Sequence, residues 1–164
     1  MQINNVEGLY AAAITKLRSA EQHGLQAYDM MLQKAKSPEL RQALERHRAE
    51  TEQQIQRLEQ ILQRAGSGAS LPVEDEIMPA ILRENQKMQS MLSNDELSDV
   101  SLIAGAQIGE HYEIAAYGTA AAHAKLLGRQ EDLQLLLQTL EEEKRTDELL
   151  TQIAERSVNK QAAV

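Results

Sequence analysis

The chain has 164 residues, enough for one domain with a substantial core. Its 17 Lys and Arg against 25 Asp and Glu give a formal net charge of −8, which disfavours binding to nucleic-acid backbones. The absence of cysteine excludes disulfides, zinc–thiolate sites, iron–sulfur clusters and thiol catalysis. No apolar run approaches the ~20 residues of a membrane helix, and no secretory signal is visible, so we expect a cytoplasmic protein.

Composition predicts an all-α fold. Ala, Leu, Glu, Gln, Lys and Arg dominate, whereas Phe and Trp are absent and only 4 Tyr and 3 Pro are present. The dominant residues are strong helix formers, and a sheet protein would need more β-branched and aromatic residues. We therefore expect one helical domain that spans residues 1–164.

Sparse turn residues divide the chain into four long helices and one short helix. Asn4 or Asn5 is the expected N-cap of the first helix, and Ser37 that of the second. The flexible segment Gly66–Gly68 ends the second helix, and Gly128 separates the last two. The predicted helices are residues 5–35, 38–64, 79–92, 96–127 and 130–158.

The lengths of the connections predict how these helices pack. Very short turns join the first long helix to the second and the third to the fourth, which forces two antiparallel hairpins. The connection between the hairpins, residues 66–93, is long and carries the short helix. This layout is typical of a ferritin-like four-helix bundle with a crossover.

Each long helix has an apolar seam that becomes acidic at mid-length. The acids on or beside the seams are Glu21, Glu50, Glu110, Glu113 and Glu143. When each hairpin is folded about its turn, Glu21 falls level with the Glu50 region, and Glu110 and Glu113 fall level with Glu143. An unpaired buried carboxylate is costly, so this level needs a partner for its charge.

We predict that multivalent cations hold these acids together. A ligand set rich in oxygen with one imidazole favours Fe or Mn, as a dinuclear centre, over copper and zinc. The alternative is that the acids are solvated flank positions and that the histidine is a core residue bonded to a carboxylate. The predicted metal ligands are Glu21, His47, Glu50, Glu110, Glu113 and Glu143.

Two other groups of residues are expected to have ordinary structural roles. The charge run 141–145 is expected on the solvated face, with only Glu143 turned inward as a ligand. Glu142 and Asp147 are expected either to support the ligands from outside or to lie on the surface. The tyrosines Tyr28, Tyr112 and Tyr117 are interpreted as core filling with one polar tip, rather than as redox groups.

Three segments of the chain, in order, carry a resemblance to a known family. They begin at His47, Glu110 and Leu140 and read His-x-x-Glu-Thr-x-x-Gln-Ile, Glu-His-Tyr-Glu-Ile-Ala and Leu-x-Glu-Glu-Lys-x-Thr-Asp. Over nearly its whole length the chain resembles the YciF/YciE-like, ferritin-like stress-response proteins of bacteria. The resemblance implies a ferritin-like bundle, often dimeric, with a dinuclear metal site.

The acids Glu110 and Glu113 also look like a pair in rubrerythrins, which are peroxide-reducing di-iron proteins. Gln53 and Thr146 stand where the di-iron pattern has histidine, three residues after Glu50 and Glu143. This departure puts the peroxidase analogy in doubt.

Two functional classes follow, and they differ in whether the protein is an enzyme. One is a metal-dependent oxidoreductase or peroxide scavenger; the other is a non-catalytic stress protein that binds metal for structure or storage. A DNA-protecting cage is disfavoured by the charge, and neither nucleic acid nor membrane is expected as a partner. The Ala-rich segment 115–124 and the absence of Phe and Trp predict a homodimer, whereas a redox partner leaves no trace in the sequence.

Overall fold

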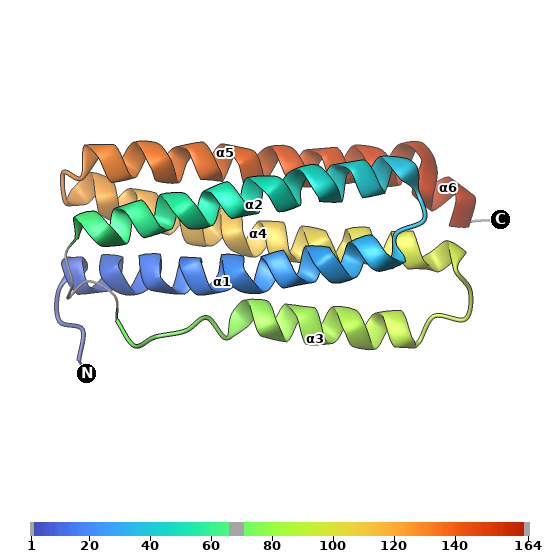
Figure 1. The fold of residues 1–164 in the computed structure, drawn as a ribbon, viewed down its shortest axis with the longest axis horizontal. Helices are drawn as coiled ribbons and strands as arrows, with labels where there is room; N and C mark the ends of the chain where they lie inside the picture. Colours follow the sequence, from blue (N-terminus) through green and yellow to red (C-terminus); the bar gives the residue numbers. More distant parts are fainter. Residues whose placement is uncertain (1, 66–70, 163–164) are drawn as a thin grey trace.

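The computed structural model describes residues 2–65 and 71–162 of the chain. Within these ranges the secondary structure is helical and no strand is present, which confirms the all-α prediction. Among the same residues, no helix has both the length and the apolar character needed to cross a membrane. The elements are α1 (Val6–Lys34), α2 (Pro38–Arg64), α3 (Ile77–Ser90), α4 (Glu96–Leu126), α5 (Gln130–Ile153), η1 (Ala154–Val158) and α6 (Asn159–Ala162) (Figure 1).

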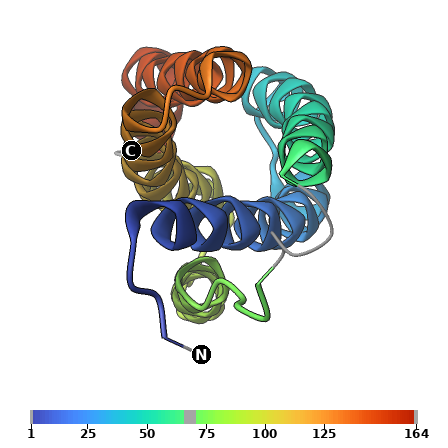
Figure 2. The same ribbon diagram turned by 90° about the vertical axis from the view of Figure 1, so that its left-hand side faces the viewer.

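The four long helices form the bundle, and α3 packs on its outside. Viewed along the bundle, α1, α2, α5 and α4 follow one another around a ring, with α3 against α1 (Figure 2). Helices α1 and α5 each contact both α2 and α4, and α3 contacts α1 and α4. The connection from α2 to α4 runs back along the bundle, so these two helices point the same way (Figure 1). This is the predicted ferritin-like arrangement of two hairpins and a crossover.

Local capping places the helix starts where the sequence predicts them. Asn5 Oδ1 accepts a hydrogen bond from the Gly8 backbone N–H at 2.8 Å, and Ser37 Oγ accepts one from the Leu40 N–H at 3.3 Å. These bonds satisfy N–H groups that the first helical turn leaves without a partner. Gly128, with a φ of 69°, makes the tight turn between α4 and α5. The predicted break at residues 66–68 lies outside the described residues.

Several helix ends differ from the prediction by one or two residues, and the start of α3 and the end of α5 differ for a structural reason. Helix α3 begins two residues before Pro79, because Asp75 Oδ2 accepts a hydrogen bond from the Met78 N–H at 2.6 Å. Pro79 then lies in the first turn, where a missing N–H breaks no helical hydrogen bond. The helix predicted for residues 130–158 is α-helical only to Ile153, and residues 154–158 continue it as a π-helical turn in which Val158 is buried.

Apolar side chains fill both ends of the bundle and leave its middle to polar groups. Each end cluster draws residues from all four long helices. The first apolar cluster contains Tyr10, Ile14, Leu17, Leu58, Ile61, Leu62, Tyr117, Ala120, Ala121, Ala124, Leu136 and Leu140. The second apolar cluster contains Tyr28, Met31, Ala35, Leu40, Ala43, Leu44, Leu102, Ile103, Ala106, Leu150, Ile153 and Val158.

The outward face of α4 carries small and apolar side chains. Ile108 is 54% exposed and Leu126 is 71% exposed, and Ala115 and Ala122 between them are exposed as well. A second copy of the chain would cover such a face. The homodimer stays a prediction.

Candidate metal centre

Three carboxylates and a histidine meet at mid-height of the bundle. His47 comes from α2, Glu110 and Glu113 come from α4, and Glu143 comes from α5. One potential ligand atom of each residue lies within 4.8 Å of the others, and all four residues are buried. We call these four residues the acidic cluster. It lies between the two apolar clusters, at the level predicted from the hairpin registers.

His47 has carboxylates on both sides of its ring. Its Nε2 lies 3.3 Å from Glu143 Oε2 and 3.4 Å from Glu110 Oε1. Its Nδ1 lies 2.9 Å from Thr146 Oγ1 and 3.4 Å from Glu50 Oε2. Burial lowers the pKa of His47, but the surrounding carboxylates outweigh burial and raise the pKa well above its usual value. A ring with one nitrogen toward the acids and the other held by outer partners is oriented as metal-binding histidines are.

Two buried tyrosines bind the acids through their hydroxyl groups. Tyr28 donates to Glu110 Oε1 at 2.5 Å, and Tyr117 donates to Glu21 Oε1 at 2.5 Å. Burial and the adjacent carboxylates raise the pKa of both phenols well above the usual value, so both remain protonated donors. Both side chains do fill the core, as predicted, and their polar tips also orient two of the acids.

Several atoms of the acidic cluster have no hydrogen-bond partner within the protein. They are Glu110 Oε2, Glu113 Oε1, Glu143 Oε2 and His47 Nε2. Buried polar atoms without partners are rare in native proteins, and each one calls for an explanation. Four of them in one cluster indicate that a cation or shared protons satisfy these atoms.

Crowding in the dry core raises the pKa values of the acids. Burial raises the pKa of Glu21 to about 7, although the hydrogen bond from Tyr117 opposes the shift. Burial is also the main cause that raises the pKa of Glu113 and of Glu143 well above the usual value, and neighbouring carboxylates add to it. Without a cation, burial and the neighbouring carboxylates therefore favour the protonated form of these acids.

The two remaining predicted ligands lie beside the acidic cluster. Glu21 is 1% exposed, and its charge acts on Glu113. The Glu50 side chain is 19% exposed, and its Oε1 accepts a hydrogen bond from Arg46 Nε at 3.2 Å. Bonds from His47 and Arg46 lower the pKa of Glu50. The alternative interpretation as a flank position thus fits Glu50 in part, whereas Glu21 lies in the core.

A buried ion pair that the sequence did not reveal borders the cluster. Arg57 on α2 donates to both oxygens of Glu142 on α5, at 2.6 and 2.9 Å. Gln54 Nε2 donates to Glu143 Oε1 at 2.5 Å and to Glu142 Oε2 at 3.2 Å, which links the pair to the cluster. The expectation that Glu142 is solvated is wrong, since the residue is 7% exposed. Glu142 meets Arg57 only because α2 packs on α5. The one hint of this pair in the sequence is that the charged Arg57 stands directly before Leu58, a core residue.

The donor set fits a cation of the iron or manganese type. Carboxylate oxygens with one imidazole suit these metals, and none of the donors is a thiolate. Ligand atoms about 2.1 Å from an ion lie at most about 4.2 Å apart, so small side-chain movements would close the cluster around one. These four residues thus form a buried group that could hold a metal.

The sequence and the fold both match known proteins. A family model described as a domain of unknown function (DUF892) matches residues 5–163. Protein YciF of Escherichia coli (strain K12) is 34% identical over 162 residues, which cover 99% of this chain and 98% of YciF. The crystal structure of YciF, described as a stress protein, has a TM-score of 0.90 and covers 96% of this chain and 99% of its own. The resemblance inferred from the sequence segments is confirmed.

Two further solved structures are similar. YcfI from Rhodopseudomonas palustris, described as a candidate structural protein, is 31% identical with a TM-score of 0.87, and the match covers 92% of this chain and 95% of YcfI. A protein from Xanthomonas campestris is 20% identical with a TM-score of 0.75, and the match covers 97% of both chains. At that identity the last comparison speaks for the fold alone.

Proposed function

The chain belongs to the DUF892 family, and on that premise we propose that it is a stress-response protein whose acidic cluster holds a dinuclear iron or manganese centre. One observation carries the proposal: four buried ligand atoms that accept or donate no hydrogen bond within the protein belong to side chains that meet within 4.8 Å. Protein interiors do not normally leave such atoms unsatisfied. Metal binding would satisfy all of them at once.

The number of buried charges supports two divalent ions rather than one. Glu21, Glu110, Glu113 and Glu143 are at most 3% exposed, and as carboxylates they would carry four negative charges. Two divalent cations balance that charge, whereas one would leave half of it in the dry core. In the proposed centre, Glu21 on α1 is a ligand of the second ion, which lies on the side of the acidic cluster that faces α1.

When bound, iron or manganese supplies the redox change that oxygen or peroxide chemistry needs. The chain's own residues would hold the centre and keep bulk water away. Tyr28 and Tyr117 orient Glu110 and Glu21, and Gln54 orients Glu143. The first and second apolar clusters pack on either side of the acidic cluster along the bundle. We propose peroxide or oxygen chemistry as the activity of such a centre.

The test is metal analysis of protein purified without chelator, with anomalous scattering at the iron and manganese edges. We expect metal at the acidic cluster, and Glu143→Gln should lower metal affinity at least about tenfold. The matched control is Glu141→Gln, two residues away on the exposed side of the same helix, which should bind metal normally. Equal metal content in both variants would contradict the proposal.

A non-catalytic structural role is the second candidate. It is favoured by the hydrogen bonds that already satisfy one oxygen each of Glu21, Glu110 and Glu143, since these bonds also suit a polar core layer. The description of YcfI points the same way. Peroxide consumption by the metal-loaded protein distinguishes the two candidates: turnover supports the first, and a rise in melting temperature without turnover supports the second.

A further inference from the structure

A surface cavity between α2 and α5 reaches the acidic cluster from one side. Its volume is about 210 Å³, and it is open to solvent. Four other cavities in the described part of the chain are lined by no residue of the acidic cluster. The inner wall of the cavity is formed by His47, Glu50 and Thr146, and charged residues at its mouth are Arg46, Arg145 and Glu148.

The inner wall of this cavity is also the outer wall of the acidic cluster. His47 lines the cavity, yet it is 2% exposed, and its Nε2 lies within 3.4 Å of Glu110 and Glu143. Thr146 Oγ1 holds the other ring nitrogen at 2.9 Å. One imidazole ring therefore separates the cavity from the unpartnered oxygens.

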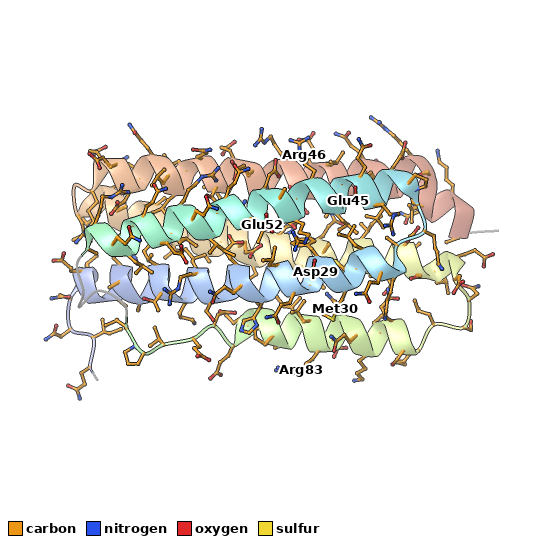
Figure 3. All side chains as sticks on the ribbon, in the orientation of Figure 1. Asp29, Met30, Glu45, Arg46, Glu52 and Arg83 are labelled. Atoms are coloured by element: carbon orange, nitrogen blue, oxygen red, sulfur yellow. The ribbon has the colours of Figure 1, made fainter. Side chains whose placement is uncertain are left out.

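Glu50 is the carboxylate of this inner wall. Its Oε2 faces His47 Nδ1 at 3.4 Å, and its Oε1 is bound by Arg46 Nε at 3.2 Å. Arg46 lies on the edge of α2 that borders α5 (Figure 3). A carboxylate at the boundary between solvent and the core can exchange an arginine for a metal cation without a large change in burial.

The other sides of the cluster are more closed. Helix α3 covers the side formed by α1 and α4 (Figure 2). On the side of the first apolar cluster, the Arg57–Glu142 pair and Gln54 fill the space between α2 and α5. Of the five cavities described above, the one at Glu50 is lined by a residue of the acidic cluster, and the other four are not.

We infer that this cavity is the entry port for metal cations and that Glu50 takes up the cation before it reaches the acidic cluster. The inference rests on the proposed function. In this role Glu50 would exchange Arg46 for the cation, and the ring of His47 would be the last side chain between the cavity and the acidic cluster. An anion would meet the buried carboxylates behind the wall and be repelled, so the port selects cations although arginines stand at its mouth.

The experiment follows the uptake of Mn²⁺ by metal-stripped protein. Protein and Mn²⁺ are mixed, an excess of chelator stops uptake at chosen times, and the bound manganese is measured after gel filtration. Gln152→Trp places a bulky side chain in the cavity, and we expect uptake at least about tenfold slower with the same final manganese content. The control Gln86→Trp puts the same side chain into a cavity between α1 and α3 and should load at the wild-type rate.

Charge variants give a second, independent readout. Glu50→Gln should slow uptake about tenfold, and Arg46→Gln should speed it several-fold, with both effects reduced at high salt. Wild-type rates in Gln152→Trp and Glu50→Gln would overturn the port while leaving the metal centre intact. If the wild-type protein takes up no manganese or iron, the proposed function fails and the port fails with it.

Discussion

The ends of the bundle and its middle differ in what they do for the free energy of folding. At the ends, aliphatic side chains such as Leu40 and Leu150 are at most 1% exposed and release water as they pack. In the middle, the acidic cluster takes charged groups out of water, and its members repel one another unless a cation or protons join them. The apolar ends therefore stabilise the fold, and this stabilisation offsets the unfavourable free energy of the acidic cluster in the middle.

The Arg57–Glu142 pair lies where these two regions meet. It borders the first apolar cluster through Leu58 and the acidic cluster through Gln54. Both charges are buried, and each is the other's counter-ion. The middle thus contains one acid that is fully paired, next to others that are not.

The largest effect is expected from breaking that pair. Arg57→Met leaves the Glu142 carboxylate buried without its counter-ion and should lower the free energy of unfolding by about 3–5 kcal/mol in urea titrations. Arg48→Met is the control, because Arg48 bonds the surface acids Asp29 and Glu52. The control should lose at most about 1 kcal/mol. If both variants lost the same free energy of unfolding, the buried Arg57–Glu142 pair would contribute no more to stability than a surface ion pair.

An end of the bundle should respond to a cavity without losing the metal. Leu150→Ala, two turns from Glu143 on α5, should destabilise the protein by about 3 kcal/mol, because the side chain is 1% exposed. Manganese content after loading should equal that of the wild type. Loss of metal in this variant would show that the two regions are not separable.

The middle should be sensitive to pH when the protein is metal-free. The folded-state pKa of Glu21, about 7, lies above its unfolded value of 4.5, and the pKa values of Glu113, Glu143 and His47 are also raised. Each group then contributes stability that is complete below its unfolded pKa and is lost as pH rises through the folded pKa. The free energy of unfolding should fall from pH 4.5 to pH 8, by about 1.4 kcal/mol for each pKa unit of a single group.

Two comparisons isolate the acids as the source of that pH dependence. Glu143→Gln should reduce the loss of stability at high pH, since the amide mimics the protonated acid. Metal loading should remove most of the loss, because cations then replace the protons. A metal-free stability that is flat or rises over this range would contradict the raised pKa values.

The smallest expected effect tests a glycine that faces the middle. Gly24 lies in the centre of α1, and a Cβ there would meet only Glu113 Oε1, at 3.8 Å. Because glycine lowers helix stability relative to alanine, Gly24→Ala should stabilise the metal-free protein by about 1 kcal/mol in thermal unfolding. Gly118→Ala on α4, where a Cβ meets nothing within 4 Å, should give a similar gain. If Gly24→Ala alone lowered the thermal stability, the Glu113 side chain would need the space that the added methyl group fills, even in the metal-free protein.

Local signals predicted most of the fold because they act within one turn of the chain. Asn5 and Ser37 cap the helices they were expected to cap. The π-helical turn at 154–158 was missed, since it depends on how Val158 packs in the second apolar cluster. When tertiary packing determines where a helix changes, the sequence of that helix carries no local signal for the change.

The height of the acidic cluster along the bundle was predictable, but which acids belong to the cluster was not. Glu113 lies one step off the regular seam and is nevertheless 3% exposed. The seam of the second helix left Glu50 or Thr51 open, and Thr51 is 1% exposed whereas the side chain of Glu50 is 19% exposed. Helix rotation in the packed bundle decides such cases, and periodicity fixes it only to within part of a turn. Glu142 was expected either to support the ligands or to lie on the surface, and its buried ion pair was missed because its partner Arg57 lies on another helix.

The crossover between the hairpins has a consequence for the order of folding. The first hairpin carries Glu21 and His47, and the second carries Glu110, Glu113 and Glu143, so neither holds the whole site. Each hairpin can form from contacts that are close in sequence, whereas the acids meet only when the two halves dock across the long connection. Electrostatic repulsion therefore enters at the docking step rather than at hairpin formation. Whatever neutralises the acids, proton or metal, therefore favours the docking of the two halves rather than the formation of either hairpin.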